Sequence, residues 1–153
     1  MEADKIRKIQ ETILDILPYW NYKIIKPFKQ LLEEGVSMEV YSCLRVLQAS
    51  NGIMTMTELA VWMKMTKQQM TKLSNRLVEL ELVKRVFDPA DRRIIKLEIT
   101  DNARNYIDSF LNCNADYFRE MLDCINEKEC IEFQTALDSV LKILMKMSYE
   151  QPK

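Results

Sequence analysis

Residues 57–100 carry the clearest structural pattern of the chain and read TELAVWMKMTKQQMTKLSNRLVELELVKRVFDPADRRIIKLEIT. In the first half of this stretch, apolar residues recur every three or four positions, which is typical of amphipathic helices. The spacing predicts two short helices, over about 58–64 and 67–80, with Thr57 and Thr66 as their N-caps. The T-x-x-Q sequence that begins at Thr66 is also a capping box. We therefore expect a helix-turn-helix.

The second half of the stretch alternates instead. Residues 83–87 (VKRVF) are rich in β-branched side chains, and 88–91 (DPAD) have the composition of a turn. Residues 94–99 (IIKLEI) return to an alternating pattern. These segments predict a two-stranded ribbon with a charged tip, and we expect no other β structure. Thr100 is placed to cap the helix that follows.

The residues on the N-terminal side are periodic as well. Apolar residues at helical spacing predict a helical arm over 3–34, which Pro18 and Pro27 are expected to kink or break. Gly35 is expected to end this arm. Ser37 is placed to cap a further helix before the helix-turn-helix.

On the C-terminal side, the pattern predicts one long helix from Thr100 to about Ile125 and a last helix that begins around Asn126. The helices on both sides carry more apolar side chains than a lobe of this size can cover. A partner chain is the natural place to bury them.

The expected fold is therefore mainly α with a small two-stranded β wing, in a single domain of residues 1–153. A winged helix-turn-helix lobe at 37–100 is expected between two helical dimerisation arms, at 3–34 and 101–149.

Composition excludes several classes of protein. The chain contains no histidine and two glycines, which removes Ser-His and Cys-His nucleophilic pairs, His-based metal sites and Gly-rich phosphate loops. Its four cysteines show no C-x-x-C spacing. We therefore expect neither an enzyme nor a resident metal or cofactor. The charged N-terminus has no apolar signal region, and the apolar runs are far shorter than the roughly 20 residues of a membrane span, which predicts a cytoplasmic protein with no membrane segment.

The charge distribution is more informative than the net charge of −1. Residues 56–100 carry nine basic and six acidic side chains, whereas the rest of the chain has 13 basic and 17 acidic ones. A basic segment between acidic flanks indicates a surface for a polyanion. On charge alone, an ordinary solvated surface explains the same pattern equally well.

Several segments of this sequence resemble the MarR family of bacterial winged-helix transcription regulators. The matching segments are TELA (57–60), LSNRL (73–77), VKR (83–85), DPADRR (88–93) and LEIT (97–100). The first two are similar to the family's helix-turn-helix, and the last three to its strand, wing and second strand. Similarity of pattern spans about residues 30–105, and outside that span only helical character matches.

Two positions depart from the family pattern. The family usually has glycine where Glu81 stands, and often has glycine where Asn102 stands. A left-handed residue at a helix end favours glycine, so Glu81 is expected to cost about 1 kcal/mol or to shift the helix end. Neither position belongs to the residues expected to face DNA.

An α-helix fits the major groove of B-DNA, where its first residues meet the base edges. The candidate DNA contacts of the second helix are Thr66, Lys67, Gln68, Gln69, Thr71, Lys72 and Arg76. Gln68 and Gln69 carry carboxamides that can address adenine bidentately, and Arg76 is expected to reach guanine or phosphate. The alternative for each residue is a polar side chain on a solvated helix face.

Two arginines at the ribbon tip, Arg92 and Arg93, are expected to enter a narrow minor groove. The alternative is a structural role, in which one arginine pairs with Asp88 or Asp91 and shapes the wing. The family resemblance implies both roles, with Asp91 as the structural partner. Weaker phosphate candidates on the ribbon are Lys84, Arg85 and Lys96.

The resemblance also implies a small, often aromatic or phenolic effector between the arms and the DNA-binding lobe. The aromatic residues that are candidates for this pocket are Tyr19, Trp20, Tyr22 and Trp62, with core packing as the alternative. No basic residue adjoins Cys113 or Cys124 in the sequence, so the cysteines are expected to be buried thiols.

One recognition helix reads too few base pairs to select a genomic site, so a two-fold dimer on a pseudopalindrome is expected, with its helices about 34 Å apart. The sequence thus predicts a homodimeric, sequence-specific regulator that binds double-stranded DNA. As the resemblance implies, we expect a repressor whose operator affinity a ligand changes by shifting populations. The alternative is a winged-helix protein-interaction module that no longer binds DNA.

Overall fold

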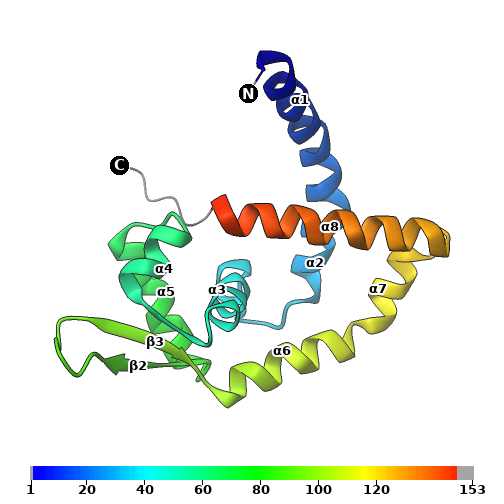
Figure 1. Cartoon of the computed structure of the whole chain (residues 1–153). Coiled ribbons are helices and arrows are strands. Elements are labelled where there is room, and N and C mark those ends of the chain that lie inside the picture. The colour runs from blue at the N-terminus through cyan, green and yellow to red at the C-terminus, as the bar shows by residue number, and fades with distance from the viewer. Residues whose placement is uncertain (1, 148–153) are drawn as a thin grey trace. The chain divides into compact units, whose positions relative to one another are not determined.

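The computed structural model describes residues 2–147, which are mainly α-helical with one small antiparallel sheet (Figure 1). The expected fold class is therefore confirmed. By its internal contacts the chain divides into two compact parts, Met1–Tyr41 and Ser42–Lys153. The expected borders of lobe and arms stay a prediction, and residues 148 and 149 of the second arm lie outside the described residues.

In the first part, the chain stays helical almost without interruption. Helix α1 (Ala3–Trp20) continues through Pro18, a π-helical segment η1 (Asn21–Ile25) follows, and α2 (Lys26–Leu31) completes the run. The expected break at Pro18 is wrong, because a proline removes one N–H donor while the rest of the helix keeps its hydrogen bonds. A kink at Pro18, the other alternative, stays a prediction. The helix changes from α to the wider π geometry at η1, which ends two residues before Pro27.

The apolar side chains of α1 lie open to solvent in the single chain. Five residues at helical spacing are 41–55% exposed, namely Ile6, Ile9, Ile13, Ile16 and Leu17. No residue of α1 is buried. A helix with this unsatisfied apolar face has little reason to be stable in water alone.

The next helix begins where predicted, but the helical arm ends earlier than expected, because α2 stops at Leu31 and Leu32 is already extended. Gly35 has a φ of +86°, a backbone conformation that glycine adopts without strain. Ser37 Oγ accepts a hydrogen bond from the backbone N–H of Val40 at 3.2 Å, and α3 (Met38–Ala49) begins there.

The sheet of the second part has three strands rather than the two expected. Its order is β1 (Ile53–Thr55), β3 (Ile95–Ile99) and β2 (Val83–Phe87), all antiparallel. The additional strand β1 follows Gly52, whose φ is +84° and whose carbonyl accepts a hydrogen bond from Ile99 N–H at 2.8 Å. Three residues are too few to show an alternating pattern, so the sequence does not reveal this strand.

The helix-turn-helix consists of α4 (Met56–Trp62) and α5 (Lys67–Glu79), as predicted within a few residues. The N-cap of α4 is Thr55 and not Thr57, because Thr55 has a glutamate at the third helical position and forms a reciprocal capping box with it. The core around these helices contains Leu44, Leu47, Leu59, Met70, Leu77, Leu97 and Ile107, each at most 1% exposed.

Both helices of the motif end in a left-handed residue that is not glycine. Lys64 has φ +52° after α4, and Glu81 has φ +58° after α5. At Glu81 the N–H bonds to Val78 O and the next N–H, of Leu82, bonds to Leu77 O, both at 2.9 Å. This is a Schellman motif with its glycine replaced, as expected from the Glu81 departure.

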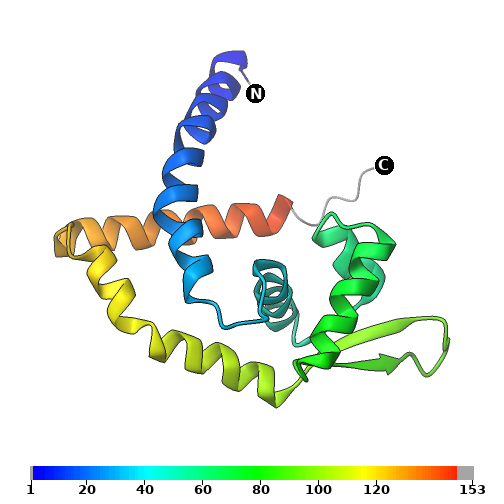
Figure 2. The same ribbon diagram turned by 180° about the vertical axis from the view of Figure 1, so that it is seen from behind.

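The long helix expected after Thr100 is divided in two. Helix α6 (Asp101–Cys113) begins at Thr100 as predicted and stops at Asn114, and α7 (Ala115–Leu122) follows at an angle (Figure 2). Asn114 has φ −105° and its side-chain amide donates to Phe110 O at 2.8 Å, which competes with regular helix hydrogen bonding.

Helix α8 (Glu127–Met147) begins where predicted. Asn126 Oδ1 accepts from the N–H of Glu129 at 3.0 Å, and the Glu129 carboxylate accepts from Asn126 N–H at 2.9 Å. No residue of α8 is buried. Among residues 2–147, no helix is long and apolar enough to cross a membrane.

Candidate nucleic-acid interface

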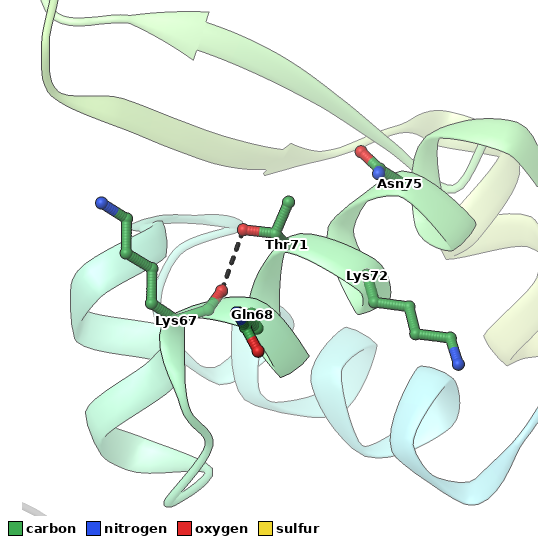
Figure 3. Close-up of a pocket in the computed structure, with 5 residues that line it drawn as sticks. All are labelled: Lys67, Gln68, Thr71, Lys72 and Asn75. Atoms are coloured by element: carbon green, nitrogen blue, oxygen red, sulfur yellow. Dashed lines mark hydrogen bonds between the residues drawn. The ribbon is translucent and has the colours of Figure 1, made fainter.

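Helix α5 packs an apolar face on the core and presents a polar face to solvent. Met70, Leu73 and Leu77 are buried at three- and four-residue spacing. The exposed side has a shallow hollow (Figure 3), which is lined by Lys67, Gln68, Thr71, Lys72 and Asn75. Because the helix has 3.6 residues per turn, positions 67, 71 and 75 form one row and positions 68 and 72 a second row beside it.

All seven predicted contacts around α5 are exposed, but two of them already bond to each other. Thr66 Oγ1 accepts from Gln69 N–H at 3.2 Å, and Gln69 Oε1 accepts from Thr66 N–H at 2.8 Å. Bidentate adenine recognition requires both the oxygen and the NH2 group of a carboxamide. Gln69 retains only its NH2 group, whereas the Gln68 side chain makes no hydrogen bond within residues 2–147.

The basic residues of α5 differ in what they contact. Lys67 and Lys72 extend away from the helix (Figure 3), and neither side chain forms an ion pair with another described residue. Thr71 Oγ1 donates to Lys67 O at 2.9 Å. Arg76 lies 3.4 Å from a Glu79 carboxylate oxygen. The two lysines are therefore the cations that α5 presents without a carboxylate partner.

Two carboxylates shape the wing tip. Asp88 accepts from Ala90 N–H at 2.9 Å and pairs with Lys96 at 3.1 Å. The Ala90 N–H, and then the Lys96 ammonium, lower the pKa of Asp88. Asp91 accepts from Arg93 through its side chain at 3.1 Å and its backbone N–H at 3.0 Å, and both bonds lower the pKa of Asp91.

The two wing arginines are therefore not equivalent. Arg93 pairs with Asp91 although its side chain is 91% exposed. Arg92 is also exposed, and its side chain makes no hydrogen bond or ion pair with any part of the chain that the structure describes. Asp91 thus bonds to Arg93, its role in shaping the wing stays a prediction, and Arg92 is the cation left available at the tip.

The three weaker phosphate candidates all have protein partners. Lys84 pairs with Glu98, and Lys96 with Asp88, each at 3.1 Å. Arg85 donates from β2 to Ser74 and Asn75 of α5. Asn75 was not among the predicted contacts. Its place four residues after Thr71, on the row that begins at Lys67, was the sequence signal that identifies it.

The four candidate effector residues are distributed over both parts of the chain. Tyr19 and Trp20 lie at the end of α1 and Tyr22 lies in η1, whereas Trp62 ends α4. All four are at least 37% exposed. They are not core residues of the single chain, and their role in binding an effector stays a prediction.

The expectation of buried thiols holds for one cysteine and fails for two. Cys43 is fully buried, which raises the pKa of its thiol to about 12. Cys113 and Cys124 are exposed in the single chain, and Cys130 is half-buried. Cys113 is the last residue of α6, and Cys124 lies two residues after the end of α7.

Comparison with known proteins identifies relatives of this chain. A family model described as MarR family matches residues 34–94. YpoP, an HTH-type transcriptional regulator of Bacillus subtilis, is 28% identical over 119 residues, which are 76% of this chain and 84% of YpoP. YsmB, a second HTH-type transcriptional regulator of that bacterium, is 30% identical over 102 residues, which are 67% of this chain and 65% of YsmB.

Solved structures share the fold. The transcriptional regulator BldR from Sulfolobus solfataricus matches with a TM-score of 0.62 and 26% identity, over 93% of this chain and 99% of BldR. A mutant of MarR from E. coli complexed with operator DNA matches with a TM-score of 0.59 and 18% identity, over 83% of this chain and 96% of that one. At this lower identity the second likeness is one of fold.

Proposed function

The chain belongs to the MarR family of winged-helix transcriptional regulators, and from this premise we propose that it is a homodimeric, sequence-specific repressor. It binds double-stranded DNA at a pseudopalindromic operator; operator DNA is the ligand in the complex of the E. coli MarR mutant. Members of this family regulate transcription and are not enzymes. A repressor acts on the chromosome, which places the proposed function in the cytoplasm.

The observation that carries the proposal is the set of unpaired cations on α5 and the wing. Lys67 and Lys72 line the hollow of α5, and Arg92 stands at the tip of the β2–β3 ribbon. In B-DNA a helix of this kind lies in the major groove, and a basic wing tip reaches the adjacent minor groove or its phosphates. Gln68 is placed among these cations with both ends of its carboxamide available for a base edge.

Exposed apolar faces support the dimer. In α8 the exposed apolar residues include Ile131, Phe133, Val140, Leu141, Ile143 and Leu144, each at least 38% exposed. Together with the apolar side of α1, they give a single chain more apolar surface than a soluble monomer tolerates. A second copy that covers these faces also supplies the second recognition helix, about 34 Å from the first.

A small aromatic ligand is the proposed effector. Tyr19, Trp20, Tyr22 and Trp62 offer exposed rings that can stack on such a ligand. By binding one arrangement of the dimer better than another, the ligand changes operator affinity by its differential affinity for the two.

Selection of bound duplexes from a random pool tests the proposal, followed by measurement of affinity against salt concentration. Six unpaired cations in a dimer predict a slope of log K against log salt of about −5. Light scattering at micromolar concentration should give the mass of two chains. A monomer, or a protein that binds no duplex at low salt, would contradict the proposal.

The second candidate function is a protein-interaction module. The near-neutral charge of −1 favours it, as do the carboxylate partners of four of the nine basic residues between 56 and 100. This alternative predicts no salt-dependent binding to DNA, so the same salt titration separates the two functions.

A further inference from the structure

Asn75 lies where the wing meets the recognition helix. It is exposed, it lines the hollow of α5, and it shares a row with Lys67 and Thr71 (Figure 3). Nothing in the family pattern quoted above assigns it a contact. Its surroundings, however, fix which end of its side chain faces outward.

Arg85 reaches Asn75 from the face of the sheet that carries Val83. The register places Arg85 two residues after the buried Val83 and opposite the fully buried Leu97, so all three share one face, where Arg85 itself is exposed. From there Arg85 Nη2 donates to Ser74 Oγ at 2.9 Å and to Asn75 Oδ1. The wing strand and the recognition helix are thus joined by one guanidinium group.

Ser74 fixes the other side of this junction. It is fully buried, and its hydroxyl donates to Thr71 O at 2.9 Å, so its oxygen remains free to accept from Arg85. A buried hydroxyl without such partners would be costly. The guanidinium is therefore held at a definite position on α5.

The chemistry of the guanidinium determines the orientation of the Asn75 carboxamide. A guanidinium carries donors and no acceptor, so the Asn75 atom that it contacts is the oxygen. The NH2 group then lies on the other side of the carboxamide, and it has no hydrogen-bond partner among residues 2–147. Asn75 offers its surroundings a donor only.

We propose that Asn75 is a DNA contact whose orientation Arg85 sets, with the NH2 group donating to a hydrogen-bond acceptor of the duplex. The inference rests on the proposed DNA-binding function and adds a residue to it. The acceptors of matching chemistry are N7 and O6 of guanine, N7 of adenine, O4 of thymine and the phosphate oxygens. Arg85 is accordingly a positioning residue and not a phosphate contact.

The substitution Asn75→Asp tests this orientation. Aspartate has nearly the same shape and still accepts from Arg85, so the junction between wing and helix is retained. Only the outward group changes, from a donor to an anionic acceptor. Asn102→Asp is the matched control, because it adds the same charge at an exposed position in the first turn of α6.

Both variants of the full-length protein are compared by melting temperature and by affinity for a duplex selected from a random pool and for an unrelated duplex. We expect Asn75→Asp to melt like Asn102→Asp and to bind the selected duplex about tenfold more weakly or worse. A loss confined to the selected duplex identifies a base acceptor, and an equal loss on both duplexes identifies a phosphate. Equal affinity of the two variants overturns the proposal.

Two further variants keep the test decisive. If Asn75→Asp melts early, Asn75→Ala takes its place, and wild-type affinity in a folded Asn75→Ala protein overturns the proposal. Arg85→Met should weaken binding while the salt slope stays at the wild-type value, and where the acceptor of Asn75 is a base it should also relax the base preference there. A lower slope for Arg85→Met would show a phosphate contact instead. If the wild-type protein binds no duplex at low salt, the proposed function itself fails, which is a distinct result.

Discussion

Replacement of Arg92 by alanine removes the one wing cation that has no partner within the described residues. The turn that carries Arg92 is held by the Asp88 and Asp91 carboxylates, which bond to Ala90 and Arg93. None of these bonds involves Arg92. The variant should therefore keep its wing and its melting temperature, and any change in DNA binding reflects the lost charge.

The size of the effect follows from counterion release. A dimer loses two cationic contacts, which should make the slope of log K against log salt shallower by about 1.8. The same slope difference corresponds to a loss of affinity of about 60-fold at 0.1 M salt and about 20-fold at 0.2 M salt. The loss should shrink toward zero near 1 M salt.

Arg93→Ala is the matched control, since it removes the same side chain from the adjacent position. Arg93 already pairs with Asp91 at 3.1 Å, so fewer of its counterions are released on DNA binding, and its slope should change by less than half as much. Fluorescence anisotropy with a labelled selected duplex, repeated at five salt concentrations, measures both slopes. A wild-type slope for Arg92→Ala combined with a shallower slope for Arg93→Ala would refute the reasoning.

Other predictions concern stability. Glu81→Gly should raise the free energy of unfolding by about 0.5–1 kcal/mol, because φ is +58° there. Glu79→Gly, at the last residue of α5, should instead lower it, by less than the roughly 1 kcal/mol of a helix interior; urea titration measures both. Gly52→Ala should destabilise by about 2 kcal/mol or more, since an added Cβ would lie 2.9 Å from Ile99 Cγ2 at φ +84°. The folded pKa of the Cys43 thiol, about 12, lies above the ordinary value of 9.0, so stability is full below pH 9 and falls as the unfolded thiol ionises. Between pH 8 and 10, wild-type protein should lose about 1.4 kcal/mol more stability than Cys43→Ala, and an equal loss would contradict the burial argument.

Features whose partners lie within a few residues could be predicted from the sequence. The capping box at Thr66 needs only the residue three positions later, and the caps at Ser37 and Thr100 are equally local. The left-handed conformation of Glu81 was predicted for the same reason, because the residue after a helix end commonly adopts it. The N-cap of α4 was predicted at Thr57 and lies at Thr55. The correct position could also have been predicted locally, because Thr55 and Glu58 form the T-x-x-E pattern of a capping box.

Features that depend on distant residues were missed. Strand β1 exists because Ile53–Thr55 pair with β3, more than forty residues later. The interruption at Asn114 was hidden because this residue falls on the apolar seam at the right spacing, and spacing alone does not register that an asparagine amide competes for a backbone carbonyl.

The sequence predicted which residues form the candidate site, but not which hydrogen bonds and ion pairs their side chains already make. Sequence identifies which side chains of α5 and the wing are polar and outward, and the predicted DNA contacts on α5 and at Arg92 and Arg93 are all exposed, whereas Asp91 and Lys96 are half-buried. It does not show which of their atoms are already bonded. The capping box at Gln69 was one exception, since a box that uses its carboxamide oxygen excludes that oxygen from bidentate adenine recognition.

Net charge is therefore a weak guide to whether this lobe binds DNA. Four basic residues of the lobe are neutralised by carboxylates, among them Glu98 and Asp88, and such pairs release few counterions when a phosphate approaches. The negative charges of the paired carboxylates, which would otherwise repel DNA, are neutralised in the same ion pairs. What remains outward on α5 and the wing is Lys67, Lys72 and Arg92, a local excess of cations on a chain whose overall charge is −1. A near-neutral winged helix with this arrangement should bind a duplex through few, well-placed contacts, so its affinity should depend more on base recognition by Gln68 and Asn75 than that of a strongly basic one.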